Sequence, residues 1–400
     1  MNIDQYAIIE RFESITKTGD IKFMIKDKNR QNICTHSFDD EYRVKGSIVP
    51  PMFLNSLFTR KKTDTPYSYS RVSNPTIDLL ENKITALEQG AWTRCFTSGM
   101  AAISACILAY CKSGDHIICV KNVYSGFQAL NNNHLKRYNI HTDYVDGRFI
   151  EEFRKSINEN TKIIYLESPT SLVFDMVDLE EVCSLAIEHK CLVLMDNTWS
   201  TPIYQNPIKY GVDIVIHSCT KYMAGHSDLL AGSVTGKDIC TLSALNSVRS
   251  DFGGTIDPHQ AWMLTRGLRT LPLRMKQHQE SAKRFCLEFA DHPKIVGILY
   301  PGFEQYPQKQ LADKYLSGYS GLLSLLIDSD YNNVHKALKT LEYFEEGCSW
   351  GGYESLYIML NKSDYDLFKD YKNSTLIRIS IGLEDTDTLI EDFKNALNKL

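Results

Sequence analysis

Between residues 101 and 218, short apolar segments typical of strands alternate with longer segments typical of helices. The predicted strands are residues 116–120, 141–145, 162–167, 191–196 and 212–218, and the predicted helices are residues 101–110, a segment after Tyr124, and residues 178–190. Parallel strands need crossover connections, which are usually helices that pack on the sheet. The alternation therefore predicts a doubly wound α/β domain whose mainly parallel sheet is covered on both faces.

The segments on either side of this region have a different character. Residues 1–74 are mixed in period and contain turn signals such as VPP, which predicts an N-terminal arm that lies on another surface. Near residue 268 the run GLRTLPLRM leads into a long helix, and later apolar runs predict strands at 322–327 and 376–382. We expect an arm over residues 1–74, an α/β domain over 75–268 and a smaller α+β domain over 269–400.

Composition narrows the class of function. Hydrophobic residues make up 43% and charged residues 23% of the 400 residues, as in folded soluble proteins. A net charge of -5 with scattered Lys and Arg argues against a nucleic-acid partner. The eleven cysteines form no CxxC pair, and no segment approaches 18 apolar residues. We therefore expect a cytoplasmic protein with free thiols, no membrane span and no export signal, and the histidines show no metal-binding spacing.

Three polar residues follow strands of the predicted sheet. Glu167 and Asp196 end two strands, and Lys221 follows a third in the run SCTKYMAGHSDLLAG. Ligands of open α/β sheets bind outside the carboxyl ends of the strands. Taken singly, the acids are also compatible with helix caps and the lysine with a surface charge. Together they suggest a buried lysine whose pKa is lowered by desolvation, which makes its amine a nucleophile for an aldehyde.

A second group of residues is suited to an anion. The stretch FTSGMAAI puts a small-residue turn before a helix, so the N–H groups of Gly99 and Met100 can face a phosphate. Ser218 and Thr220 add hydroxyl donors close to Lys221 in the sequence. Taken alone, this stretch is better explained by an ordinary N-cap serine followed by a helix, and the hydroxyls near Lys221 are the second observation that favours an anion site.

Eight segments, in order, resemble the signature segments of the Cys/Met metabolism family of enzymes that depend on pyridoxal 5'-phosphate (PLP), which includes cystathionine lyases and synthases. The segments are YSRVSNPT (69–76), FTSGMAAI (96–103), ESPT (167–170), DNTWSTP (196–202), SCTKYMAGHSD (218–228), TRGLRTLPLRM (265–275), SWGGYESL (349–356) and IRISIGLED (377–385). The resemblance spans about residues 45–395. It implies a PLP-dependent transferase-like fold, fold type I, with a mainly parallel seven-stranded sheet, an N-terminal arm and a smaller α+β C-terminal domain.

The resemblance also implies roles for individual residues toward PLP. Lys221 carries the cofactor, and Asp196 contacts the pyridine nitrogen, so that the ring stays protonated as an electron sink. The phosphate is expected to be bound by Gly99, Met100, Ser218 and Thr220. Tyr69 and Arg71 are expected to reach it from a neighbouring subunit. A homodimer with shared sites, and a tetramer of two such dimers, are therefore expected.

The remaining roles concern the ring face and the substrate. Tyr124 in VYSG is expected to stack on the cofactor and to shuttle a proton, although a buried aromatic after a strand would look the same. Arg378 is expected to clamp the substrate carboxylate with its guanidinium fork, assisted by Ser349. Ser171 stands where family members often have Asn, and Trp350 is expected to line the substrate side.

The family divides by the substrate carbon that loses its group. Both branches begin with proton removal at Cα by the freed Lys221 amine, and γ chemistry needs a second deprotonation at Cβ. Members that act at Cγ typically show ESLGG where this chain has CSWGG, which puts Cys348 in place of their glutamate. Together with Trp199 and Trp350, this resembles bacterial cystathionine β-lyases of trans-sulfuration and methionine biosynthesis. The sequence thus predicts a lyase for a sulfur amino acid that releases homocysteine, pyruvate and ammonia from cystathionine.

Other functions remain open at this point. Within PLP chemistry the alternatives are a cystathionine γ-synthase or γ-lyase and, more distantly, an aminotransferase. Outside enzymes, the chain could be a PLP-binding regulator or a catalytically inactive scaffold. The presence together of a lysine, an acid and a carboxylate clamp argues against the last two.

Overall fold

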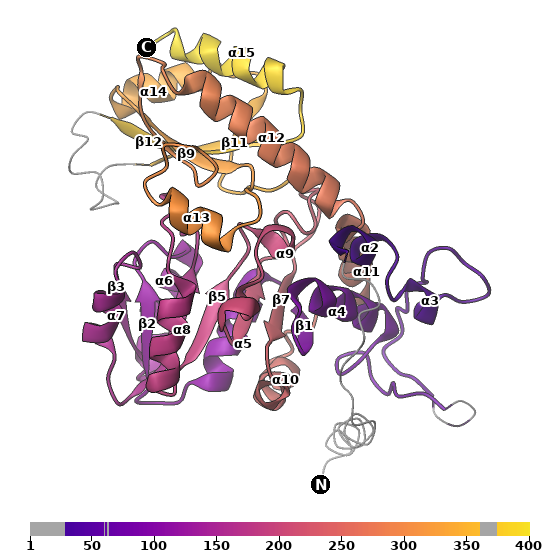
Figure 1. Ribbon diagram of the computed structural model, residues 1–400. Helices are drawn as coiled ribbons and strands as arrows, with labels where there is room; N and C mark the ends of the chain where they lie inside the picture. The colour runs from indigo at the N-terminus through magenta and orange to yellow at the C-terminus, as the bar shows by residue number, and fades with distance from the viewer. Residues whose placement is uncertain (1–28, 60, 62–63, 361–373) are drawn as a thin grey trace.

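The computed structural model describes residues 29–59, 61, 64–360 and 374–400. Figure 1 shows two β-sheets, each with packed helices, and an N-terminal segment at the side of the larger unit. The helices are α2 (Arg30–Thr35), α3 (Asp39–Tyr42), α4 (Pro75–Glu88), α5 (Gly99–Tyr110), α6 (Ser125–Asn133), α7 (Ile150–Ser156), α8 (Leu179–Glu188), α9 (Thr201–Tyr204), α10 (Leu242–Asp251), α11 (Pro258–Leu268), α12 (Leu271–Phe289), α13 (Lys309–Tyr315), α14 (Tyr331–Leu338) and α15 (Thr386–Leu397).

The larger unit is built on a sheet that, over the described residues, has seven strands in the order β1-β7-β6-β5-β4-β2-β3. The strands are β1 (Trp92–Phe96), β2 (His116–Val120), β3 (His141–Val145), β4 (Thr161–Glu167), β5 (Leu192–Asp196), β6 (Ile214–His217) and β7 (Gly232–Gly236). The strands from β3 to β6 run parallel, and β7 is antiparallel to both of its neighbours. This confirms the predicted mainly parallel seven-stranded sheet.

Burial explains why the predicted strand segments form the centre of the sheet. Every residue of β2, β6 and β7 is buried. Side chains of a strand alternate between its two faces, so complete burial means that both faces are covered. Helix α5 packs on β6, β7 and β1, while α8 packs on β5. The predicted helices and strands of this unit are confirmed, whereas the antiparallel β1 and β7 were not predicted.

The smaller unit is an α+β layer on a five-stranded sheet of order β10-β11-β12-β9-β8, counted over the described residues. Its strands are β8 (Ile295–Leu299), β9 (Leu322–Ile327), β10 (Phe344–Glu346), β11 (Ser355–Leu360) and β12 (Thr375–Ser380). Helix α12 leads into this unit and packs against α15. The rings of Phe285, Phe289 and Phe393 lie with centroids 4.7–5.1 Å apart and form part of its core. The α+β character is confirmed, and the boundaries at 74/75 and 268/269 stay predictions.

The N-terminal segment is attached to its own chain at α2 and α3. Ile33 and Cys34 are buried in a cluster with residues of α4, α11 and α12. The amine of Lys83 lies 3.0 Å from the Asp39 carboxylate, and both side chains are almost fully buried. Lys83 also donates to the carbonyl of Ser37 at 2.6 Å. The described part of the predicted arm therefore has an anchor within the subunit.

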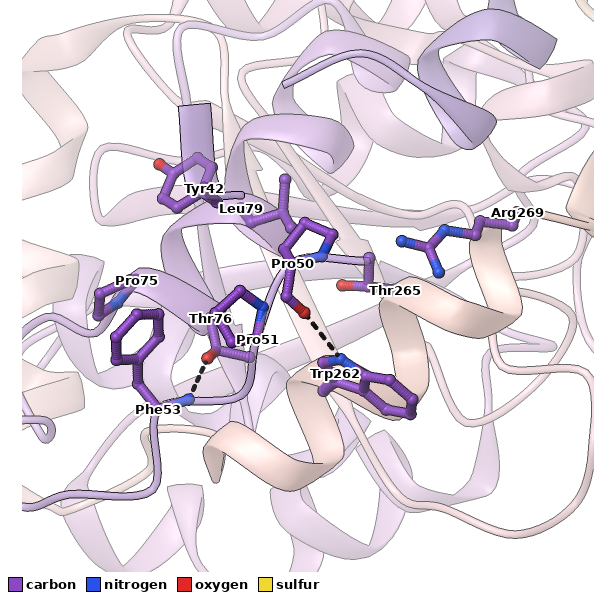
Figure 2. Close-up of a pocket in the computed structure, with 10 residues that line it drawn as sticks. All are labelled: Tyr42, Pro50, Pro51, Phe53, Pro75, Thr76, Leu79, Trp262, Thr265 and Arg269. Carbon is purple, nitrogen blue, oxygen red and sulfur yellow. Dashed lines mark hydrogen bonds between the residues drawn. The ribbon is translucent and has the colours of Figure 1, made fainter. Parts of the chain in front are cut away.

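Figure 2 shows a small pocket between this segment and helices α4 and α11. Trp262 Nε1 donates to the Pro50 carbonyl at 3.2 Å, and Phe53 N donates to Thr76 Oγ1 at 2.9 Å. The lining residues are Tyr42, Pro50, Pro51, Phe53, Pro75, Thr76, Leu79, Trp262, Thr265 and Arg269. The volume of about 10 Å³ has room for roughly one water molecule. The pocket contains none of the predicted site residues and is too small for a cofactor.

The buried pair of Lys83 and Asp39 generates a stability prediction. Lys83→Met leaves a buried carboxylate whose remaining cation, Arg269, lies 3.5 Å away and is partly exposed. We expect the free energy of unfolding, measured with urea, to fall by about 3–5 kcal/mol. Lys155→Met is the matched control, because Lys155 pairs with Glu152 at the surface and should cost about 0–1 kcal/mol. Equal losses in the two variants would contradict the anchoring role of Lys83.

Candidate functional site

The predicted strand-end residues meet at the carboxyl edge of the parallel sheet. Glu167 ends β4, Asp196 ends β5, and these two residues are direct partners in the register of the strands. Their side chains are nearly buried, with residue exposures of 9% and 8%. Strand β6 ends at His217, and the chain then turns through Ser218 toward Lys221. The site is therefore built on neighbouring parallel strands, as the sequence predicted.

The two carboxyl groups are held by different donors. Asp196 Oδ1 accepts hydrogen bonds from Thr198 N at 3.0 Å and from Thr198 Oγ1 at 2.5 Å. Burial raises the pKa of Asp196, while the bonds from Thr198 act in the opposite direction. Burial and the adjacent Asp196 raise the pKa of Glu167 to about 8, because two buried negative charges side by side are unfavourable. Both carboxyl groups are therefore harder to ionise than the same groups in water.

Glu167 links the carboxyl pair to two predicted site residues. Its Oε2 accepts from Tyr124 N at 2.7 Å, and its Oε1 accepts from Ser171 Oγ at 2.7 Å. Tyr124 is the N-cap residue of helix α6 and is 45% exposed, so its ring borders the open side of the site. A Cβ on Gly126 would lie 2.3 Å from the Tyr124 ring and 2.7 Å from Met100 Sδ, which places these side chains together. Burial, followed by the charge of Asp196, raises the pKa of Tyr124 and favours its neutral phenol.

Lys221 lies where the two units meet. Its Nζ donates to Ser349 Oγ at 2.9 Å and lies 5.4 Å from the centre of the Trp350 ring. Burial lowers the pKa of Lys221, and the positive charge of Arg378 lowers it further. Both effects favour the neutral amine, which is the nucleophilic form.

Arg274 holds the loop that carries Lys221 through hydrogen bonds to backbone carbonyls. This guanidinium donates to the carbonyls of Tyr222 at 2.6 Å and Gly267 at 2.8 Å. Gly225 has a φ of +72°, and a Cβ there would lie only 1.9 Å from Arg274 Nη1. The motif at 265–275 thus has a structural role, because it fixes the turn that follows Lys221.

The predicted anion-binding residues also converge. Helix α5 begins at Gly99, whose N–H and that of Met100 have no acceptor within the helix. A Cβ on Gly99 would lie 2.8 Å from Ser218 Cβ, so glycine permits close approach of the helix start to Ser218. The Thr220 hydroxyl is less free, because it accepts from Ala231 N at 3.0 Å and lies 3.2 Å from the Ala231 carbonyl.

Arg378 lies on β12, close enough to Lys221 for its positive charge to lower the pKa of that lysine. Its Nη2 donates to the carbonyls of Cys348 at 2.8 Å and Ser349 at 3.2 Å. The guanidinium therefore stands next to the serine that contacts Lys221. Cys348 is exposed as a free thiol at the start of the same loop.

Tyr69 and Arg71 are not brought to this cluster within the subunit. Arg71 Nη1 donates to the Ser250 carbonyl at 3.0 Å, and its guanidinium lies 5.6 Å from the centre of the Tyr69 ring. Among the described residues, no hydrogen bond or ion pair joins either side chain to Lys221 or to Gly99. Within one subunit, the structure therefore does not bring Tyr69 and Arg71 to the predicted phosphate site.

Sequence reasoning missed Thr198 and the contacts of Glu167. Thr198 Oγ1 donates to Asp196 and accepts from Ser218 N at 2.8 Å, so it connects two predicted site residues. Its position as the third letter of DNT was the available signal. Glu167 was recognised at a strand end, but its bonds to Tyr124 and Ser171 depend on tertiary contacts.

The residues present fit PLP in charge and shape. Asp196 is a buried carboxylate whose hydrogen-bond donors are the neutral groups of Thr198, so it is suited to a cationic ring nitrogen. Lys221 offers an amine whose pKa is lowered, and the start of α5 lies against Ser218 where a phosphate would find N–H and hydroxyl donors. Over the described ranges, no group of three or more His, Cys, Asp or Glu side chains could hold a metal ion. Within the same ranges, no helix is long and apolar enough to cross a membrane.

Comparison with known proteins gives a consistent picture. The model of the family described as Cys/Met metabolism PLP-dependent enzyme matches residues 32–398. The cystathionine γ-lyase of Bacillus subtilis is 35% identical over 89% of this chain and 95% of its own length. The cystathionine β-lyase of Lactococcus lactis subsp. cremoris is 35% identical over 89% of this chain and 96% of its own length. The crystal structure of cystathionine γ-synthase from Xanthomonas oryzae pv. oryzae, in complex with aminoacrylate and cysteine, is 28% identical with a TM-score of 0.87, over 93% of this chain and 98% of that one.

The raised pKa of Glu167 predicts how the cofactor-free protein depends on pH. A group whose pKa rises from 4.5 to about 8 on folding binds more protons in the folded state, so its stabilising contribution is complete below pH 4.5 and is lost as pH rises through 8. Glu167→Gln should therefore flatten the fall in unfolding free energy between pH 5 and 8, by about 1.4 kcal/mol per unit of pKa shift removed. Urea unfolding across this range measures it. Glu159→Gln, an exposed control, should keep the wild-type slope, and an unchanged slope in Glu167→Gln would contradict the assignment.

Proposed function

The chain belongs to the Cys/Met metabolism family of PLP-dependent enzymes, and we propose that it is a carbon–sulfur β-lyase that converts cystathionine to homocysteine, pyruvate and ammonia. Membership makes it a PLP-dependent enzyme of sulfur amino-acid metabolism. Its relatives carry the names of both β- and γ-lyases. The choice between these reactions therefore rests on the residues around Lys221.

We propose that Lys221 binds PLP covalently through Nζ and that Asp196 pairs with the ring nitrogen. The lowered pKa of Lys221 and the buried position of Asp196 support these roles. When bound, PLP supplies a protonated pyridine ring that withdraws electrons and stabilises negative charge at the substrate Cα. Asp196 keeps this ring protonated, since a carboxylate beside the nitrogen favours the cationic form.

The phosphate binds at the start of α5 and at the loop that carries Lys221. The N–H groups of Gly99 and Met100 point outward from the first turn of the helix, where the helix dipole favours an anion. Ser218 offers a hydroxyl beside Gly99. Thr220 contributes on condition that its hydroxyl exchanges its contact with Ala231 for one with the phosphate.

Proton transfer falls to Lys221 and Tyr124. The free Lys221 amine would act as the base that takes the proton from the substrate Cα, for which its lowered pKa is favourable. Tyr124 would stack on the cofactor ring when it is bound and, as a neutral phenol, would donate a proton to the departing thiolate sulfur. Its backbone is fixed by Glu167, which keeps the phenol over the site.

The substrate is bound from the smaller unit. Arg378 clamps the substrate carboxylate with its guanidinium fork, and the neighbouring Ser349 hydroxyl assists it. Trp350 forms the apolar wall beside Lys221 and is held by the Tyr222 ring at 5.5 Å. The Ser171 hydroxyl donates its hydrogen to Glu167, so its oxygen can only accept a hydrogen bond from the substrate side of the site.

One observation carries the choice of β-elimination. Within the part of the chain that the structure describes, no carboxylate lies within 4 Å of the Lys221 amine, and the side chain at the start of the facing loop is the Cys348 thiol. Cleavage at Cβ needs a single deprotonation, at Cα. Cleavage at Cγ needs a second one at Cβ, for which a carboxylate at position 348 would be the suitable base.

This proposal predicts the products from cystathionine. The wild-type protein should release pyruvate, homocysteine and ammonia, and Lys221→Ala should lower the rate by about 10³-fold or more because the base is removed. Identification of the oxo acid by chromatography measures the outcome. Release of 2-oxobutyrate and cysteine as main products would make the chain a γ-lyase.

A matched pair of variants tests the role of position 348 itself. Cys348→Glu should increase the share of 2-oxobutyrate, because it adds a carboxylate near Lys221. Cys348→Ser, which removes the thiol and adds no charge, should keep the wild-type ratio of products. Equal ratios in both variants would show that position 348 does not select the reaction.

We further propose a homodimer in which the arm completes the neighbouring site, with two dimers forming a tetramer. The arm exposes large apolar side chains, which indicates a covered surface in the assembly. These are Val44, Ile48, Val49, Leu54, Leu57 and Tyr69. In such a dimer, Tyr69 and Arg71 would reach the phosphate of the partner subunit.

Mixing two inactive variants tests the shared site. After subunit exchange between Arg71→Ala and Lys221→Ala, each heterodimer has one site with both residues intact, so about one quarter of the sites should be active. Activity before and after exchange is the measurement. Asp196→Asn mixed with Lys221→Ala is the control and should not recover, because both residues act in the same subunit. No recovery in the first mixture, with exchange proven by mass, would reject the shared site.

A further inference from the structure

The loop after β4 contains a strained turn next to the predicted site residue Ser171. Val173 N donates to the Ser171 carbonyl at 2.8 Å, and Leu172 between them has a φ of +68°. This combination defines a γ-turn of the positive-φ type, which is rare and strained. Phe174 also has a positive φ, of +60°. Residues with a Cβ seldom adopt such angles, so other contacts must hold this loop.

Two hydroxyl groups of the smaller unit supply such contacts. Ser324 Oγ on β9 donates to the Leu172 carbonyl at 2.7 Å. Tyr306 OH, from the segment between β8 and β9, donates to the Phe174 carbonyl at 2.6 Å. Both donors are buried, and each bonds the carbonyl of a residue with positive φ. The smaller unit thus holds the backbone of the turn on either side of Val173.

The side chain of Val173 adds an apolar contact to the same sheet. Val173 is buried and forms a cluster with Leu326 of β9 and Leu376 of β12. The turn is therefore attached to the smaller unit through both its backbone and its side chain, although it belongs to the larger unit.

The two strands that hold the turn also carry Arg378. In the antiparallel register of β9 and β12, Ser324 lies directly opposite Arg378. Side chains at directly opposite positions project from the same face of a sheet. On the other side of the turn, Ser171 N donates to the Asn122 carbonyl at 2.9 Å, and the Ser171 hydroxyl donates to Glu167. Relaxation of the turn would therefore move Ser171 relative to Arg378.

We propose that Ser324 and Tyr306 are positioning residues that hold the strained turn and thereby fix Ser171 relative to Arg378. The inference rests on the proposed role of Arg378 as the clamp for the substrate carboxylate, and it is independent of the choice between β- and γ-elimination. Neither hydroxyl needs to touch the substrate or the cofactor. Their loss should weaken binding of the substrate carboxylate and leave the affinity for PLP unchanged.

Free glycine is a suitable probe, because it has the carboxylate that Arg378 is proposed to bind and no group that can be eliminated. Its dissociation constant is measured from the change in absorbance of the PLP-loaded protein, and that of PLP from titration of the cofactor-free protein. Ser324→Ala and Tyr306→Phe should each weaken binding of free glycine by about threefold to tenfold, the effect of one lost hydrogen bond. The affinity for PLP should stay at the wild-type value.

Ser281→Ala is the matched control for the loss of a buried hydroxyl. Ser281 lies on α12, is also buried, and its Oγ lies 2.8 Å from Thr386 Oγ1 on α15. This contact is within the smaller unit and does not involve the turn. Ser281→Ala should therefore keep the wild-type affinity for free glycine.

Substitutions at Leu172 test the strain itself. A glycine residue adopts positive φ without strain, so Leu172→Gly added to Ser324→Ala should restore most of the lost affinity for free glycine. Leu172→Ala removes the partly buried side chain beyond Cβ and keeps the strain, so it should restore none. In urea unfolding of the cofactor-free protein, Leu172→Gly should also have a higher midpoint than Leu172→Ala.

Wild-type affinity for free glycine in both Ser324→Ala and Tyr306→Phe would overturn the inference, and so would equal recovery with Leu172→Gly and Leu172→Ala. A parallel loss of PLP affinity would make the two hydroxyls structural only. Wild-type affinity for free glycine in Arg378→Ala would instead refute the clamp on which the inference rests. If Ser324→Ala does not fold, Tyr306→Phe decides, because it removes a hydroxyl and keeps the packed ring.

Discussion

The register between the parallel strands β4, β5 and β6 is the constraint on which the site depends. Glu167 stands opposite Asp196, and Asp196 stands opposite Ile216. Side chains alternate between the faces of a sheet, so a slip of one residue in β5 would turn Asp196 away from the site. Because these strands are packed on both faces, such a slip would also place their side chains where they do not fit the neighbouring elements, and the core of the larger unit therefore fixes the position of the carboxylate.

The smaller unit supplies the side chains that contact Lys221. Lys221 leaves the end of β6, but its hydrogen-bond partner Ser349 and the Trp350 ring come from the loop before β11. A Cβ on Gly351 would lie 2.8 Å from Tyr222 N, so the glycine lets this loop approach the lysine turn closely. The shielding that lowers the Lys221 pKa is thus produced by contact between two units that are far apart in the sequence.

The charge of the site depends on two neighbouring carboxyl groups. Asp196 and Glu167 are buried side by side, which favours protons on the carboxyl groups. In the role proposed for Asp196, a cationic ring nitrogen beside its carboxylate would act against this tendency. Without such a cationic partner, a lone carboxylate at this buried sheet edge would be costly.

The sequence by itself determined the elements and the chemistry of individual positions. Apolar runs such as CLVLMD become buried strands in any packed sheet, and the run around Lys221 carries its family signature regardless of its surroundings. These features are local, so local pattern was sufficient for the mainly parallel sheet, for Asp196 at a strand end and for Gly99 at a helix start.

Only the tertiary structure decided which residues act on one another. Ser324 and Leu172 lie 152 positions apart and look like an ordinary strand serine and loop leucine in the sequence. Ser171 gives its hydroxyl hydrogen to Glu167, and Tyr69 and Arg71 lie outside the cluster of their own subunit. Contacts of this kind depend on how strands, helices and subunits pack, and packing is set by the whole core rather than by any one segment.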